Sequence, residues 1–200
     1  MLGIESYELM KKKYGRVASW AVWRPAGDTV KSNTDNMDWV NDDDLLDTLS
    51  TGFVFVGLNG SSTHRPGPDT QRRGAWRNFH SGDNRRQNDF KLRFALSGTR
   101  YWGSYITDLI KYYPEVDSSK VKVCLRKNPK MITKNVSAFE KEISFLGEKP
   151  VLVALGVTVY KLLVKHLEGE YNIVKVKHYA AYIRKETYRE EVLKTLDKIR

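Results

Sequence analysis

The chain has 200 residues, the size of one domain, and its 40% hydrophobic and 12% aromatic residues can build a buried core, which excludes wholesale disorder. A single cysteine excludes a disulfide scaffold and any metal or iron–sulfur site that needs several thiolates. The net charge of +10 favours a polyanionic partner. The longest apolar stretch is too short to span a bilayer and the first residues lack a signal-peptide pattern, so we expect a cytoplasmic protein without membrane association.

The hydrophobic pattern predicts strands that alternate with helices. A helix over 4–13, a short strand over 17–23 and a helix over 42–49 precede the main series. In that series we expect strands at 53–56, 104–108, 151–155 and 172–176, and helices at 76–80, 87–96, 135–146, 157–167 and 186–199.

These elements predict an α/β fold. Continuous apolar runs in the strands indicate burial on both faces, as in a parallel sheet. We therefore predict a three-layer α/β/α architecture around a central, mainly parallel four-stranded sheet. The chain would form a single domain, in which residues 1–50 are an N-terminal extension and residues 51–200 are the core.

Basic residues gather in two parts of the chain. Residues 72–100 carry eight basic and two acidic side chains, and residues 151–200 carry ten and six. Aromatic residues alternate with the arginines of the first part, which suits phosphate contacts and stacking on bases. A basic face that only keeps the surface hydrated would have the same composition. The DNA-binding residues predicted in this part are Arg72, Arg73, Arg77, Arg85 and Arg86.

Polar side chains follow the predicted parallel strands where each strand ends. They are Asn59, Asp108 and His178, and Gly156 opens the helix after the third strand. The carboxyl ends of parallel strands meet at one edge of a sheet, and ligands bind there. A carboxamide, a carboxylate and an imidazole at one edge, next to a basic segment, predict a binding or catalytic site.

These residues resemble the motifs of the uracil-DNA glycosylase superfamily, over about residues 50–190. Gly57-Leu58-Asn59-Gly60 after a buried strand is similar to its first motif, with Asn59 at the catalytic position, as in the mismatch-specific uracil/thymine branch. His178 stands where the family has a histidine after the last strand, and residues 105–111 and 151–156 are similar to its other two strands. The chain differs in having Gly60 in place of a proline, no Pro-Ser after His178, and Asp108 where several branches carry asparagine.

The resemblance implies a glycosylase that flips a base out of DNA and hydrolyses its N-glycosidic bond, leaving an abasic site, without a metal or another cofactor. Asn59 would hold the attacking water, Asp69 is the candidate base, and His178 would donate a hydrogen bond to the departing base. The base-binding residues would be Gly57, Leu58, Trp76, Phe79 and Asp108. Either aromatic residue of this set, Trp76 or Phe79, can stack on the base or belong to the core.

Residues after His178 stand where related enzymes insert a wedge into the duplex. Tyr179 and Tyr182 would fill the space that the base leaves. Arg184, Lys185 and Arg189 would hold the flanking phosphates.

Asp108 bears on the choice of substrate. An ionised carboxylate only accepts hydrogen bonds, and cytosine presents an amine where uracil presents a carbonyl. The superfamily includes bacterial enzymes that excise bulky modified cytosines, such as the glucosylated hydroxymethylcytosine of phage DNA, as a defence. The sequence therefore predicts a modified cytosine as a substrate beside uracil-like bases, with a turn-capping aspartate as the alternative for position 108.

Two other functions stay open. A catalytically silent DNA- or RNA-binding module on the same fold would carry the same charge and the same altered motifs. A nucleotide-binding α/β enzyme would use residues 57–62 as a phosphate cradle, although they lack the spacing of the known glycine-rich loops. The four histidines are scattered, so we expect no metal site, and we expect a monomer that binds DNA.

Overall fold

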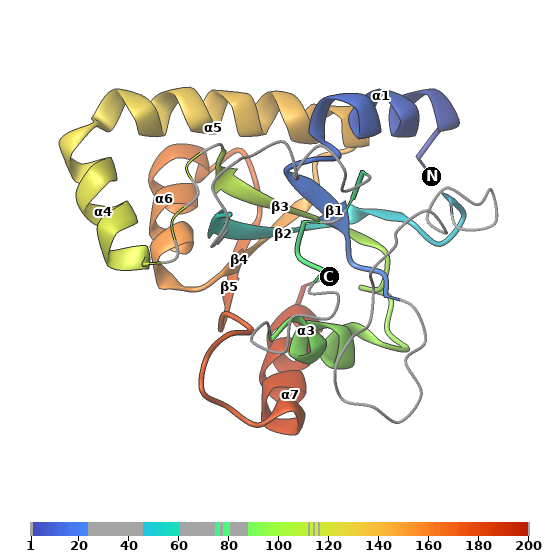
Figure 1. Cartoon of the computed structure of the whole chain (residues 1–200). Coiled ribbons are helices and arrows are strands. Elements are labelled where there is room, and N and C mark those ends of the chain that lie inside the picture. Colours follow the sequence, from blue (N-terminus) through green and yellow to red (C-terminus); the bar gives the residue numbers. More distant parts are fainter. Residues whose placement is uncertain are drawn as a thin grey trace.

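A computed structural model describes residues 2–23, 46–60, 75–76, 78–80, 88–111, 113, 115 and 117–199. A single sheet crosses this part of the chain, with helices on both of its faces (Figure 1). Its strands are β1 (Ala18–Trp20), β2 (Ser50–Asn59), β3 (Ser104–Ile110), β4 (Val151–Leu155) and β5 (Ile173–Val176). The helices are α1 (Ile4–Tyr14), α3 (Asp89–Leu96), α4 (Ser118–Lys127), α5 (Pro129–Ile143), the short η3 (Ser144–Leu146), α6 (Val157–Leu167) and α7 (Lys185–Leu196).

The α/β class is confirmed, but the prediction of a mainly parallel four-stranded sheet is wrong. The strand order is β1-β3-β2-β4-β5, in which the last four strands are parallel and β1 runs antiparallel to β3. The sheet is therefore mixed and has five strands. Strand β1, which we expected in an N-terminal extension, pairs with the outer edge of β3. Without β1, the backbone N–H and C=O groups along that edge of β3 would have no strand partner.

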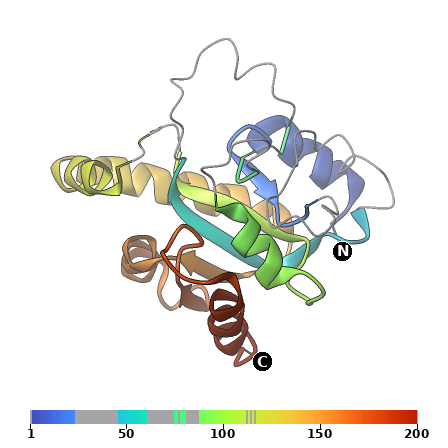
Figure 2. The ribbon, with the colours of Figure 1, turned by 60° about the horizontal axis from the view of Figure 1, so that its bottom comes forward.

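The two faces of the sheet bury two hydrophobic clusters. Successive side chains of a strand point to opposite faces, so Val54 and Val56 pack towards α1, α5 and α6, whereas Phe55 packs towards α3 and α7. Figure 2 shows α3 and α7 on one side of the sheet and α1 and α5 on the other. This double burial explains why the strand sequences are continuously apolar.

Two predictions about helices need correction. Of residues 76–80, expected to be helical, the described residues 76, 78 and 79 lie in turns, and Trp76 and Phe79 have φ angles of 67° and 69°, outside the helical region. Helix α4 was not predicted, because Val121 and Leu125 are its only buried residues and make too thin an apolar stripe. Of the helix expected at 42–49, only residues 46–49 are described.

No helix in the described ranges is long and apolar enough to cross a membrane.

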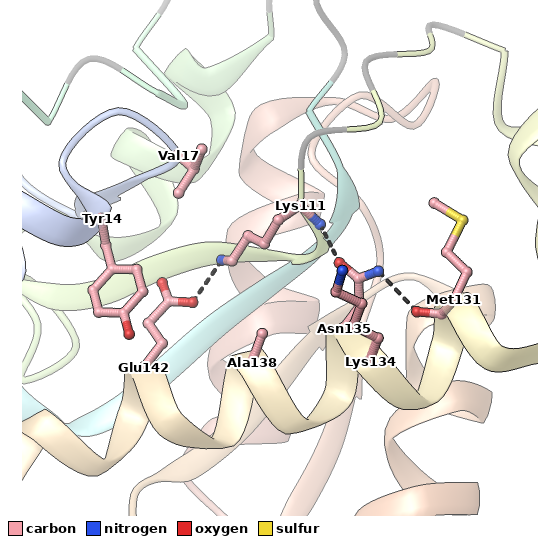
Figure 3. A pocket seen from close by; sticks show the side chains of 8 residues that line it. All are labelled: Tyr14, Val17, Lys111, Met131, Lys134, Asn135, Ala138 and Glu142. Carbon is pink, nitrogen blue, oxygen red and sulfur yellow. Dashed lines mark hydrogen bonds and ion pairs between the residues drawn. The ribbon is translucent and has the colours of Figure 1, made fainter.

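A buried ion pair ties α5 to β3. Glu142 of α5 has no exposed surface, and its carboxylate accepts hydrogen bonds from the Tyr105 hydroxyl at 2.9 Å and the Thr107 hydroxyl at 2.8 Å. Its second oxygen lies 2.7 Å from Nζ of Lys111, at the end of the same strand (Figure 3). Buried charges are tolerated only with such partners, so this cluster fixes how the helix sits on the sheet.

The Glu142→Ala substitution should lower the free energy of unfolding by about 3–5 kcal/mol, because it leaves the charge of Lys111 buried without its partner. The matched control is Glu191→Ala, which breaks the exposed pair of Glu191 with Lys177 and should cost less than about 1 kcal/mol. Urea denaturation measures both. Equal losses in the two variants would contradict this account of the buried pair.

Candidate functional site

The carboxyl group of Asp108 lies against the backbone of Gly57. The two residues are direct partners in the parallel pairing of β2 with β3. A Cβ atom on Gly57 would collide with Oδ1 of Asp108 and would lie 3.4 Å from Cε1 of Phe79. Only glycine leaves room for this approach, so the glycine of the first motif makes space for the carboxyl group and the aromatic ring beside it.

Asp108 is buried, with 5% of its surface exposed, and this changes its ionisation. Burial raises the pKa of Asp108 to about 7, although the positive charge of Lys111 and a hydrogen bond at 3.4 Å from Nδ2 of Asn78 oppose the rise. The preference for cytosine predicted from the sequence requires the ionised form of this carboxyl group. A pKa near 7 means that it also exists as the protonated acid at neutral pH and can then donate a hydrogen bond.

The side-chain amide of Asn59, at the end of β2, is held in one orientation. Its Nδ2 donates to the backbone carbonyls of Gly60 at 3.2 Å, Tyr113 at 3.1 Å and Glu115 at 2.9 Å. Only the NH₂ end of an amide can donate to carbonyl oxygens, so Oδ1 is directed away from them. An amide oxygen in a fixed direction can hold a water molecule by accepting its hydrogen bond.

His178 follows β5 and has a defined tautomer at neutral pH. Its Nδ1 accepts a hydrogen bond from the backbone N–H of Ala180 at 3.0 Å. Burial lowers the pKa of His178 to about 4, so the ring is neutral at pH 7 and carries its proton on Nε2. The residue lies beside the turn from β4 into α6, where Gly156 has a φ of 106° and a Cβ atom would be 3.8 Å from that of His178.

Tyr179 follows His178 in the segment after β5. Its ring stacks on that of His178 with 4.3 Å between the centroids. Burial, and then the negative charge of Asp108, raise the pKa of the Tyr179 hydroxyl. Nζ of Lys91 in α3 donates to the carbonyl of Ala181 at 2.7 Å and holds this segment in place.

The residues predicted at the strand ends therefore lie at one edge of the sheet. Gly57 and Phe79 lie beside the carboxyl group of Asp108, and a Cβ atom on Gly60, next to Asn59, would be 3.7 Å from its Oδ2. Sequence reasoning missed Asn78 and Lys111. Lys111 could have been found as the first charged residue after Asp108, whereas Asn78 lies in irregular turns that no periodicity reveals.

Trp76 belongs to the core. It is fully buried, its ring packs 5.8 Å from that of Tyr7 and 5.9 Å from that of Trp20, and its Nε1 donates to the Tyr7 hydroxyl at 3.1 Å. Half-buried Phe79 is the aromatic residue of the predicted pair that lies beside Asp108. Leu58 is partly buried against the cluster of hydrophobic residues under α1, α5 and α6.

The predicted DNA-binding residues divide into three groups. Tyr182 is fully exposed, and Arg184 and Lys185 lie 3.8 Å and 3.5 Å from the carboxylate of Glu186. Arg189 donates to the carbonyls of Ala95 and Ser97 at 3.1 Å and 3.0 Å, so it caps the end of α3 instead of extending towards a phosphate. Arg72, Arg73, Arg77, Arg85 and Arg86 lie outside the described residues, as does Asp69, the candidate base.

A cavity of about 340 Å³ is lined by residues of α5 and by Lys111 after the end of β3 (Figure 3). Its polar lining groups bond to one another. The N–H of Lys111 donates to Oδ1 of Asn135 at 2.8 Å, and Nδ2 of Asn135 donates to the carbonyl of Met131 at 2.8 Å. Across the described ranges, no three His, Cys, Asp or Glu side chains come close enough together to hold a metal ion.

Comparison with known proteins leaves the site to be interpreted from its geometry. No protein-family model matches the chain, and no curated protein or solved structure matches it significantly.

Replacement of Asp108 by asparagine should change how stability depends on pH. Because burial raises the pKa of Asp108 from 3.8 to about 7, the folded protein keeps this proton over a range where the unfolded chain has lost it. The stability from this group is complete below pH 3.8 and is lost as the pH rises through 7. Relative to the wild type, Asp108→Asn should therefore gain stability with rising pH, as measured by urea denaturation across this range.

The control for that series is Asp117→Asn, which removes a titrating carboxylate at the exposed N-cap of α4 but leaves an amide oxygen that can still accept the capping hydrogen bond. The Ser119 backbone hydrogen bond lowers the pKa of Asp117, so the contribution of Asp117 is constant above pH 3.8. A difference between Asp108→Asn and the wild type that stays constant with pH would contradict the raised pKa.

Proposed function

We propose that the protein is a monofunctional DNA glycosylase, which flips a base out of DNA and hydrolyses the bond between the base and the sugar. The observation that carries this proposal is the packing of Asp108 on Gly57 beside the ring of Phe79, next to the oriented amide of Asn59. A flat ring beside a buried hydrogen-bonding group suits a flipped base, which needs stacking on its face and hydrogen bonds at its edge. The resemblance of these residues to glycosylase motifs supports the same reading.

The residues divide the chemistry between them. The base would stack on Phe79 with its edge at Asp108, and Oδ1 of Asn59 would hold the attacking water. An amide cannot take a proton at neutral pH, so catalysis depends on stabilising the departing base, on which negative charge develops. Neutral His178 can serve this purpose by donating from Nε2 to a carbonyl oxygen of the base. Asp69 stays the candidate for accepting the proton of the water.

The two protonation states of Asp108 suit different bases. The ionised carboxylate accepts a hydrogen bond from the N4 amine of cytosine, and the protonated acid donates one to O4 of uracil or thymine. The substrates we propose are thus modified cytosines, such as glucosylated hydroxymethylcytosine in a defence against phage, and uracil-like bases. The pH then decides which class is favoured.

Asn59→Ala and His178→Ala should both slow the formation of abasic sites. Loss of one oriented donor costs roughly 2.7–4 kcal/mol of barrier, so His178→Ala should lower the rate about 10²–10³-fold. The assay uses duplexes with uracil, thymine mismatches or modified cytosines, under single-turnover conditions. Asn172→Ala and His166→Ala, which remove the same residue types elsewhere, are the controls and should keep the wild-type rate.

The outcome of this panel also separates the classes of function. If the wild-type protein releases no base but binds DNA in a salt-sensitive way, the glycosylase proposal is wrong and a catalytically silent DNA-binding module is supported. Release of uracil alone would refute the proposal for modified cytosines.

The relative rates on the two classes of base should change with pH around 7. As the pH rises through the pKa of Asp108, the ionised form increases, so excision of a cytosine-type base should rise and excision of a uracil-type base should fall. Asp108→Asn does not titrate and should give a ratio of the two rates that is constant with pH. A ratio that changes equally in wild type and variant would show that another group reads the base.

A further inference from the structure

Helix α4 and the first half of α5 carry a surface of six basic side chains. We call it the α4–α5 basic surface, and it consists of Lys120, Lys122, Arg126, Lys127, Lys130 and Lys134. All six are exposed. Residues 118–139 contain no acidic residue, so nothing within this stretch of chain neutralises the charge.

The helix geometry keeps these cations on the outside. Val121 and Leu125 are buried and fix one side of α4 against the rest of the protein, so the four basic residues of this helix are turned to solvent. Among the described residues, the six form no ion pair, in contrast to Lys177, which lies 2.8 Å from a carboxylate oxygen of Glu191. The surface is therefore a concentrated positive charge on a rigid support.

This surface adjoins the candidate site. The carbonyls of Tyr113 and Glu115, which hold the amide of Asn59, precede α4 by a few residues. Figures 1 and 2 both show α4 beyond the end at which β2 and β3 stop, so the cations continue outward from the edge that carries Asn59.

The composition of the surface indicates what it binds. Duplex DNA carries about one negative charge per 1.7 Å of its axis, and lysine and arginine side chains bind it by releasing counterions. Residues 118–134 contain no aromatic side chain that could stack on a base, and the exposed polar neighbours of the six cations, such as Ser118, Ser119 and Asn128, can also bind phosphate oxygens. The contacts of this surface would thus be mainly with the phosphate backbone.

We propose that the α4–α5 basic surface binds the phosphate backbone of the DNA that flanks the base in the candidate site. The choice of DNA over other polyanions rests on the proposed function. The surface fixes the register of the duplex, while Asp108 and Phe79 receive the base.

The experiment compares two triple variants, each of which removes three positive charges. One is Lys122→Gln with Arg126→Gln and Lys127→Gln, and the matched control is Lys12→Gln with Lys194→Gln and Lys198→Gln, all exposed and remote from α4 in the sequence. Binding to a labelled duplex without modified bases is measured at several salt concentrations. Circular dichroism and urea denaturation verify that both variants are folded.

The surface variant should bind more weakly, and the slope of log affinity against log salt should become shallower by about one per lost phosphate contact, up to about three. The control should keep the wild-type slope. Identical slopes in both variants would overturn the proposal, even if the protein releases bases. A shallower slope in the surface variant alone supports the proposal, even if no base is released.

The same variants separate DNA from a membrane as the partner. Vesicles that contain phosphatidylserine are the second probe, because anionic headgroups attract clustered lysines as well. Binding to these vesicles that exceeds binding to DNA, and is lost only in the surface variant, would overturn the proposal in favour of a membrane.

Discussion

The contact between the Asp108 carboxyl group and the backbone of Gly57 determines the arrangement of the candidate site. It depends on the parallel pairing of β2 with β3, which brings these two residues side by side. Phe79 rests on the same glycine, and Asn59 follows it two residues later on the strand. One strand pairing thus positions the buried acid and the amide together, and Phe79 joins them from a turn outside the sheet.

Burial acts on the two titratable groups of the site in opposite directions but with one effect. It raises the pKa of Asp108 to about 7 and lowers that of His178 to about 4, and both changes favour the neutral form. At neutral pH His178 is therefore neutral and Asp108 is partly protonated, in a protein with a net charge of +10. The attraction for a polyanion comes from the surface around the site, and the recognition of one base comes from hydrogen bonds within it.

The sequence predicted the parts of the fold that a strong apolar pattern marks. The four parallel strands and helices α1, α3, α6 and α7 follow from continuous or periodic apolar runs. Strand β1 was predicted as a strand, but its pairing with β3 was not, because an edge strand has no separate sequence signal. The helix predicted at residues 76–80 is wrong, because Trp76 and Phe79 have positive φ angles that no apolar pattern reveals.

The sequence predicted those residues of the candidate site that lie at the ends of strands. Asn59, Asp108 and His178 were found because the topology of a parallel sheet brings strand ends together. The raised pKa of Asp108 and the core position of Trp76 depend on packing, which no spacing reveals. The basic surface of α4 and α5 was missed for a related reason, because six cations over fifteen residues form a surface only when both helices are known.

The approach of Asp108 to Gly57 also limits how this chain can evolve. Any side chain at position 57 displaces the carboxyl group at position 108, whereas a smaller residue at 108 makes room at 57. A side chain at position 57 therefore fits without moving the carboxyl group only after Asp108 has been replaced by a smaller residue. A chain that keeps the carboxyl group of Asp108 in its present position therefore keeps a glycine at position 57.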